Sequence, residues 1–114
     1  MSKRIVRVNE LLKREISAQL HTHYRTQAVR ITISDVETAP DLRWARVYYS
    51  VLGDESARIE ADALLRRIAK ELRHRVGKEV ILKYLPQLEF CYDPSLERGA
   101  SILEVIDEIE QDNE

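Results

Sequence analysis

The sequence predicts a single α+β domain in which helices cover one face of a three-stranded mixed sheet. The first observation behind this prediction is the spacing of apolar residues, which changes from a helical period of three to four residues to the strand period of two, and then back. The second is size, because 114 residues, 44% of them hydrophobic, suffice to bury one core without disulfides or metal. The predicted order of elements is α-β-β-α-(α)-β-α.

An amphipathic helix opens the chain and should end between His21 and Tyr24, where its pattern stops. Its apolar residues lie three or four positions apart and share one face: Ile5, Val8, Leu12, Ile16 and Leu20. The opposite side is rich in cations, so this helix is expected to present part of a basic surface to solvent.

Two strands should follow as an antiparallel hairpin. Residues 28–34 alternate β-branched and polar side chains, as a half-buried strand requires. Residues 45–51 alternate in the same way. Between the two runs, Pro40 and Asp41 suit adjacent turn positions, because proline fixes φ and aspartate hydrogen-bonds nearby backbone.

A second helix should begin after Gly53, with Asp54 or Ser56 as its N-cap. Its apolar residues again recur at helical spacing: Ala61, Leu64, Leu65, Ile68, Leu72 and Val76. At about 100° per residue, five cations fall together on the opposite side, and Arg75 returns to the edge of the apolar face. The five are Arg66, Arg67, Lys70, Arg73 and Lys78.

Residues 80–92, VILKYLPQLEFCY, predict a third strand, with Pro86 at a bulge or an exposed edge. After a turn, apolar residues within 96–109 predict a final helix that runs into an acidic tail. We expect a folded domain over residues 1–106 and a flexible acidic tail over residues 107–114.

Charge is separated along the chain, although the net charge is only −2. Residues 66–78 hold six cations and one acid, and residues 1–30 hold seven cations and two acids. Residues 87–114, by contrast, hold nine acids and one cation. Segregated charge of this kind can create a local positive field that attracts phosphate even where the total charge is near zero.

Several other features argue against further chemistry. The single cysteine, Cys91, cannot form an internal disulfide, the first residues lack the apolar core of a signal peptide, and no apolar run approaches the roughly 20 residues that span a bilayer. We therefore expect a cytoplasmic protein without a membrane partner. His21 and His23 would point to different sides of a helix, which favours interaction with the helix dipole over a metal site.

The sequence contains no phosphate-binding loop, catalytic triad or paired-acid site, so we expect a binding protein that is not an enzyme and needs no cofactor. The role of Trp44, close to the predicted turn, stays open between base stacking and packing.

Three stretches resemble, in order and spacing, segments of the bacterial ribosome-binding factor A family: RIVRVNELLKREI, PDLRWARVYYSVLG and LRHRVGKEVILKYLPQLEFCYDPSLERGASI. The resemblance runs from about Arg4 to about Ile106. Its most specific residues are Asp41, Leu42, Ala45, Val47, Tyr48, Pro86, Leu88, Phe90, Asp93 and Ser95. The resemblance implies a KH-like fold of the second topological type. It also implies binding to the small ribosomal subunit during late maturation of its RNA, which helps growth in the cold.

One departure from the family pattern concerns the long second helix. Family members commonly kink it at a small residue that is followed one position later by glycine, but the aligned positions here are Ile68, Ala69 and Lys70. The kink is therefore expected to be reduced, shifted or absent. The three glycines of the chain also provide no GxxG loop to clamp single-stranded nucleotides, so recognition should depend on shape and charge.

Two hypotheses about function follow. In the first, the protein binds the immature small ribosomal subunit and its ribosomal RNA, as a monomer when free, and assists maturation and processing without catalysis or DNA binding. The RNA-binding residues would then be Arg66, Arg67, Lys70, Arg73 and Lys78, joined by Arg4, Arg7 and Arg14 of the first helix. In the second, the protein is an interaction adaptor of the same fold with no RNA binding, and the basic face is only a solvated surface.

Overall fold

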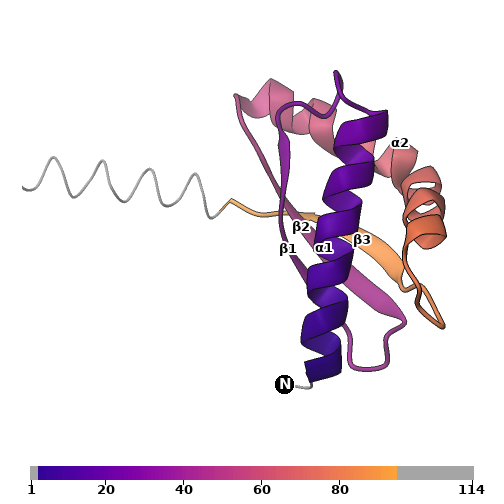
Figure 1. Ribbon diagram of the computed structural model, residues 1–114. Helices are drawn as coiled ribbons and strands as arrows, with labels where there is room; N and C mark the ends of the chain where they lie inside the picture. Colours follow the sequence, from indigo (N-terminus) through magenta and orange to yellow (C-terminus); the bar gives the residue numbers. More distant parts are fainter. Residues whose placement is uncertain (1–2, 95–114) are drawn as a thin grey trace, which may run out of the picture.

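A computed structural model describes residues 3–94 of the chain. The elements are α1 (Lys3–His23), β1 (Ile31–Thr38), β2 (Trp44–Val51), α2 (Glu55–Glu79) and β3 (Gln87–Tyr92), as shown in Figure 1. The strands form one sheet in the order β1-β2-β3, with β1 and β2 antiparallel and β2 and β3 parallel. The predicted α+β class with a mixed three-stranded sheet is confirmed. The helix expected within 96–109 and the tail over 107–114 lie outside the described residues.

Helix α1 buries the apolar face that its periodicity predicted. Val8, Leu12, Ile16 and Leu20 are buried, and Ile5 is half-buried near the start of the helix. At the other end, Nε2 of His21 lies 2.8 Å from the carbonyl oxygen of Ile31, and Nδ1 lies 3.0 Å from that of Ser17. The His21 ring therefore ties the last turn of α1 to the first residue of β1.

The hairpin differs from its prediction at the start of β1. The strand begins at Ile31, so the expectation of a strand from residue 28 is wrong for residues 28–30, and the side chain of Val29 is 72% exposed. Further along, the register shifts between Ile33 and Asp35. This irregularity restores the inward orientation of Val36 after an extra residue, so both halves of β1 pack on the same core.

The turn between β1 and β2 is closed by backbone and side-chain hydrogen bonds. The N–H of Ala39 donates to the carbonyl of Trp44 at 2.8 Å, and the N–H of Arg43 donates to Oδ1 of Asp41 at 3.0 Å. Asp41 therefore acts as the turn residue that the sequence predicted. Leu42 has a φ of 61°, in the left-handed region that leucine rarely adopts, so the closed turn holds one residue in a strained conformation.

Helix α2 begins at the predicted cap, because Oδ1 of Asp54 accepts a hydrogen bond from the N–H of Ala57 at 3.0 Å. Its six predicted apolar residues, from Ala61 to Val76, are all buried. The helix is unbroken across residues 68–70, where family members kink, yet Figure 1 shows its ribbon crossing the end of the sheet and then descending toward the start of β3. The change in direction therefore occurs without a break in the helix.

The third strand is shorter than predicted. It begins at Gln87, after Pro86, and the expectation of a strand over residues 80–86 is wrong. Pro86 has no N–H to donate to a ladder, and its carbonyl oxygen accepts a hydrogen bond from Arg73 of α2 instead. The segment 80–86 therefore follows α2, and pairing with β2 starts only at Gln87.

One core joins these elements. The inward side chains of β2, Ala45, Val47 and Tyr49, are buried under α1 and α2, whereas Trp44 and Arg46 point outward and are exposed. Within residues 3–94, no helix is long and apolar enough to cross a membrane. The helices thus cover one face of the sheet and leave their own outer surfaces and the hairpin end open to partners.

Candidate nucleic-acid interface

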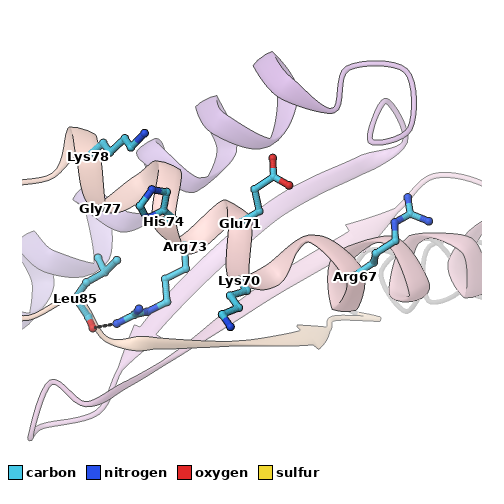
Figure 2. A pocket seen from close by; sticks show the side chains of 8 residues that line it. All are labelled: Arg67, Lys70, Glu71, Arg73, His74, Gly77, Lys78 and Leu85. Carbon is cyan, nitrogen blue, oxygen red and sulfur yellow. Dashed lines mark hydrogen bonds between the residues drawn. The ribbon is translucent and has the colours of Figure 1, made fainter.

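A cationic hollow of about 760 Å³ lies along the C-terminal half of α2, and we call it the α2 hollow (Figure 2). It is lined by Arg67, Lys70, Glu71, Arg73, His74, Gly77, Lys78 and Leu85. Four of the five α2 cations predicted to bind RNA therefore share one surface, and Arg66 lies outside it. His74, which the sequence analysis did not single out, lies between them at helical spacing.

The cations of the α2 hollow do not all point the same way. In Figure 2, Lys70 and Arg73 extend toward one side of α2, whereas Arg67 and Glu71 extend toward the other. Arg67, Lys70 and Lys78 are exposed. The charged side chains that line the hollow thus extend to both sides of α2.

Arg73 is half-buried and has a structural contact as well as a charge. Its Nε donates to the carbonyl oxygen of Pro86 at 3.0 Å, and its Nη2 donates to that of Leu85 at 2.6 Å. Charge-assisted bonds of this kind are stronger than neutral ones, so they fasten segment 80–86 to α2. Arg73 therefore shapes the wall of the hollow while leaving a cation at its base.

Close packing at Gly77 completes this wall. A Cβ placed on Gly77 would lie 3.2 Å from Cδ2 of Leu85, which is closer than ordinary van der Waals contact. The absence of a side chain at this position lets segment 80–86 approach the helix.

Arg66 lies on the neighbouring side of α2 and is paired with an acid. Its Nε lies 3.1 Å from Oδ2 of Asp62, and Asp62 also accepts a hydrogen bond from the buried Tyr49 hydroxyl at 3.3 Å. Burial, and then the Asp62 carboxylate, raise the pKa of Tyr49 to about 12. The charge of Arg66 is thus partly balanced by the Asp62 carboxylate.

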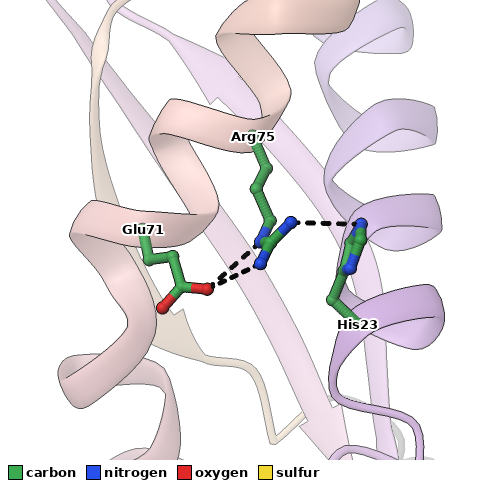
Figure 3. A network of polar contacts seen from close by, with 3 residues as sticks. All are labelled: His23, Glu71 and Arg75. Carbon is green, nitrogen blue, oxygen red and sulfur yellow. Dashed lines mark hydrogen bonds and ion pairs between the residues drawn. The ribbon is translucent and has the colours of Figure 1, made fainter.

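The one acid in the hollow, Glu71, is engaged by Arg75 at the boundary between α2 and α1 (Figure 3). Nη2 and Nε of Arg75 donate to Oε1 of Glu71 at 2.9 and 3.2 Å. Nη1 of Arg75 lies 3.4 Å from Nε2 of His23, which must accept because a guanidinium has no acceptor. The Tyr24 hydroxyl, and then Arg75, hold the pKa of Glu71 below its usual value. The negative charge of Glu71 therefore balances Arg75 more than it balances the cations that line the hollow.

The three predicted cations of α1 lie elsewhere. Arg4, Arg7 and Arg14 are all exposed on α1, and none of them lines the α2 hollow. Arg4 lines a different hollow, together with Tyr84 and Pro86. The structure thus does not gather the cations of both helices around this one hollow.

Other candidate residues offer no reactive site. Burial raises the pKa of the Cys91 thiol, which disfavours the thiolate that a nucleophile or metal ligand requires. Across residues 3–94, no group of histidine, cysteine, aspartate and glutamate side chains is arranged to hold a metal ion. The charged residues that line the α2 hollow are, by contrast, mostly cations.

Fold and site together define a small α+β binding domain with a cationic surface on its long helix. A family model described as ribosome-binding factor A matches residues 4–106. The chain therefore belongs to the ribosome-binding factor A family.

Relatives support this assignment over nearly the full chain. The ribosome-binding factor A of Opitutus terrae is 47% identical over 111 residues, which cover 97% of this chain and 91% of that protein. The protein of the same name from Caldanaerobacter subterraneus subsp. tengcongensis is 34% identical over 111 residues, covering 96% of this chain and 91% of its own length.

Solved structures share the fold. The crystal structure of ribosome-binding factor A from Thermus thermophilus matches with a TM-score of 0.68 at 22% identity, covering 77% of this chain and 94% of that one. A model of the Thermus thermophilus factor fitted into a cryo-electron microscopy map of its complex with the 30S subunit matches with a TM-score of 0.60 at 21% identity, covering 74% and 89%. The domain accordingly has the KH-like fold of these structures.

Proposed function

We propose that this protein binds the immature small ribosomal subunit through the α2 hollow and assists late maturation and processing of its RNA without catalysis. The observation that carries the proposal is that Arg67, Lys70, Arg73 and Lys78 all line one hollow. The Thermus thermophilus relative, which shares the fold, has been fitted into a complex with the 30S subunit. Family membership and a surface suited to phosphate thus point to the same partner.

Phosphate contacts give affinity without reading base sequence. The logarithm of the binding constant falls linearly with the logarithm of the salt concentration. Each phosphate that the protein neutralises adds about −0.9 to this slope on B-form DNA and about −0.7 on a single strand. A protein that docks on folded RNA through such contacts recognises the path of the backbone. The shape of the α2 hollow, with segment 80–86 as one wall, then selects which backbone path fits.

A factor of this kind changes RNA structure by differential affinity. If it binds one conformation of the maturing RNA better than another, it shifts the population toward the first by the ratio of the two affinities. No bond is made or broken, so no catalytic group or cofactor is required. In this proposal the factor acts in the cytoplasm as a monomer, and its loss should impair growth most in the cold.

The test is a charge reversal on the exposed part of the hollow. We expect Arg67→Glu/Lys70→Glu to weaken binding to purified immature small subunits by roughly tenfold or more, because two attractive contacts become repulsive. The matched control is Lys3→Glu/Arg25→Glu, which changes the net charge equally at exposed cations away from the α2 hollow. Circular dichroism should be unchanged in both variants.

Equal weakening in both double variants would mean that net charge alone sets the affinity, and the α2 hollow would lose its assignment. Binding partners that remain attached after nuclease treatment, with no affinity for small subunits, would instead support the adaptor hypothesis.

A further inference from the structure

A second hollow, of about 670 Å³, lies at the hairpin end of the sheet, and we call it the aromatic hollow. Trp44 and Tyr84 both line it, and their side chains are 54% and 74% exposed. Trp44 begins β2, whereas Tyr84 belongs to segment 80–86. Figure 1 shows the hairpin turn and this connection close together at the same end of the molecule. Two large exposed rings from distant parts of the sequence therefore face one space.

The backbone around these rings is fixed before any ligand binds. The carbonyl of Trp44 accepts from Ala39, and the carbonyl of Arg43 accepts from the N–H of Gln87 at 2.8 Å. Leu42, on the rim, keeps its left-handed conformation through a 2.9 Å bond from its N–H to the carbonyl of Ala39. The platform that carries Trp44 is thus pre-organised, which lowers the entropic cost of binding.

Cations surround the rings. Leu42 and Tyr84 also line an adjoining hollow of about 290 Å³ that includes Arg4 and Lys83. Nζ of Lys83 lies 5.6 Å from the centre of the Tyr84 ring, and Arg43 lines the aromatic hollow itself. The one acid on the lining, Asp41, already accepts a hydrogen bond within the turn. The charge around the rings therefore favours an anionic ligand.

We propose that Trp44 and Tyr84 form a stacking site for an unpaired RNA base, with Arg43 and Lys83 placed to bind the adjoining phosphates. Single-stranded nucleic acid is held in this way in proteins, because every base has a flat face that stacks on aromatic rings while cations follow the backbone. The inference goes beyond the proposed function but rests on it, since the α2 hollow would supply most of the affinity for RNA.

Continuity between the two hollows supports RNA as the occupant. Leu85 lines both the α2 hollow and the aromatic hollow, and Arg73 holds its carbonyl oxygen, as Figure 2 shows. An RNA strand that follows the α2 cations can thus pass over segment 80–86 and place an unstacked base between the rings. Ile81, which is 100% exposed, lines neither hollow.

The sequence provides a direct reporter for this site, because Trp44 is the only tryptophan in the chain. We would titrate the full chain with a short single-stranded oligoadenylate and with a blunt RNA duplex, following Trp44 fluorescence and the anisotropy of end-labelled RNA in parallel. Both RNAs should bind, but only the single strand should quench Trp44, because only its bases are free to stack.

Variants at Tyr84 separate stacking from general attraction. We expect Tyr84→Leu to weaken binding of the single strand roughly 5- to 150-fold, the range observed for loss of one stacked base, and to leave binding of the duplex unchanged. Tyr84→Phe keeps the ring and should preserve the affinity. Ile81→Ala, a neighbouring exposed position outside both hollows, is the matched control and should behave as the wild type.

The outcomes distinguish this inference from the proposed function. If both RNAs bind while Trp44 fluorescence stays constant, the stacking site is overturned and the α2 hollow keeps its role. If neither RNA binds, the stacking site is overturned, and the proposed function is decided separately by binding to purified immature small subunits. A Trp44 response to RNA-free ribosomal proteins, without one to RNA, would assign the aromatic hollow to a protein segment and overturn the inference.

Discussion

The α2 hollow is lined mainly by charged side chains of one helix, whereas the aromatic hollow is lined by side chains from a turn, the start of two strands and a loop. Charge on one face of a helix follows from residue spacing alone. The position of Trp44 and Tyr84 on the lining of one hollow depends instead on where the parallel strand β3 is placed beside β2. The part of this surface proposed to bind any RNA backbone is therefore local in sequence, and the part proposed to select unpaired bases is not.

Segment 80–86 connects the two hollows, and Arg73 attaches it to α2. Removing this attachment should give the largest change in stability. Replacing Arg73 by methionine would leave the carbonyl oxygens of Leu85 and Pro86 without their charged donor. We expect the free energy of unfolding to fall by about 1.5–3 kcal/mol, the range for hydrogen bonds to a charged group. Urea denaturation followed by circular dichroism measures this change.

Arg73→Lys is the matched control, since it keeps the charge but not the two-pronged geometry, and its loss of stability should be smaller. A methionine variant as stable as the wild type would show that segment 80–86 stays in place without Arg73.

Salt dependence should separate the two hollows with a smaller effect. For a blunt RNA duplex, Arg67→Gln/Lys78→Gln should reduce the magnitude of the slope of log K against log salt for each phosphate that the variant no longer neutralises, by about 0.9 if the value for a DNA duplex applies. For a single strand, Tyr84→Leu should lower the affinity at every salt concentration and leave the slope unchanged. Fluorescence anisotropy over a salt series gives both quantities. The distinction between the hollows breaks down if the two variants change slope and affinity in the same proportion.

The smallest expected effect concerns the acid of the α2 hollow. Because the pKa of Glu71 is lowered in the fold by Tyr24 and then by Arg75, its stabilising contribution is complete above its ordinary pKa of 4.5 and is lost as the pH falls through the lower folded value. Glu71→Gln should therefore destabilise the protein at neutral pH, and the difference from the wild type should shrink on acidification. Thermal unfolding at a series of pH values tests this, with the exposed Glu79→Gln as the control. A constant difference would show that Glu71 is not held by these partners.

Residue spacing predicted the two helices and the hairpin because each buries a periodic apolar face. The six predicted core residues of α2 are buried, and so are four of the five predicted for α1: Val8, Leu12, Ile16 and Leu20. Asp54 was one of two candidate N-caps, and it is the residue that caps α2. Its position after Gly53, at the start of an apolar helical pattern, indicated this role. The local sequence pattern was therefore sufficient to predict an element whose buried face follows from its own residue spacing.

Residues 28–30 were wrongly expected to be strand because local turn bonds, from Ala28 N–H to the Tyr24 carbonyl and from Ile31 N–H to the Ala28 carbonyl, decide that segment. The error at residues 80–86 arose where long-range contacts decide the structure. Residues 80–86 are rich in apolar side chains and look like a strand, but Arg73 takes two of their carbonyl oxygens and Pro86 lacks a donor. Arg73 itself was expected only as an RNA ligand, because spacing on a helix cannot show which loop returns to it. For the same reason the sequence left the role of Trp44 open, since only the folded chain places Tyr84 on the lining of the same hollow.

The most direct test of the central claim, that the α2 hollow binds RNA of the small subunit, is sedimentation of cell lysate through a sucrose gradient at low and high salt. The wild type should migrate with small subunits at low salt, be absent from translating ribosomes, and move toward the top of the gradient at high salt. The Arg67→Glu/Lys70→Glu variant should remain near the top at both salt concentrations. Wild-type protein at the top in both conditions, or a double variant that still migrates with small subunits, would contradict the account.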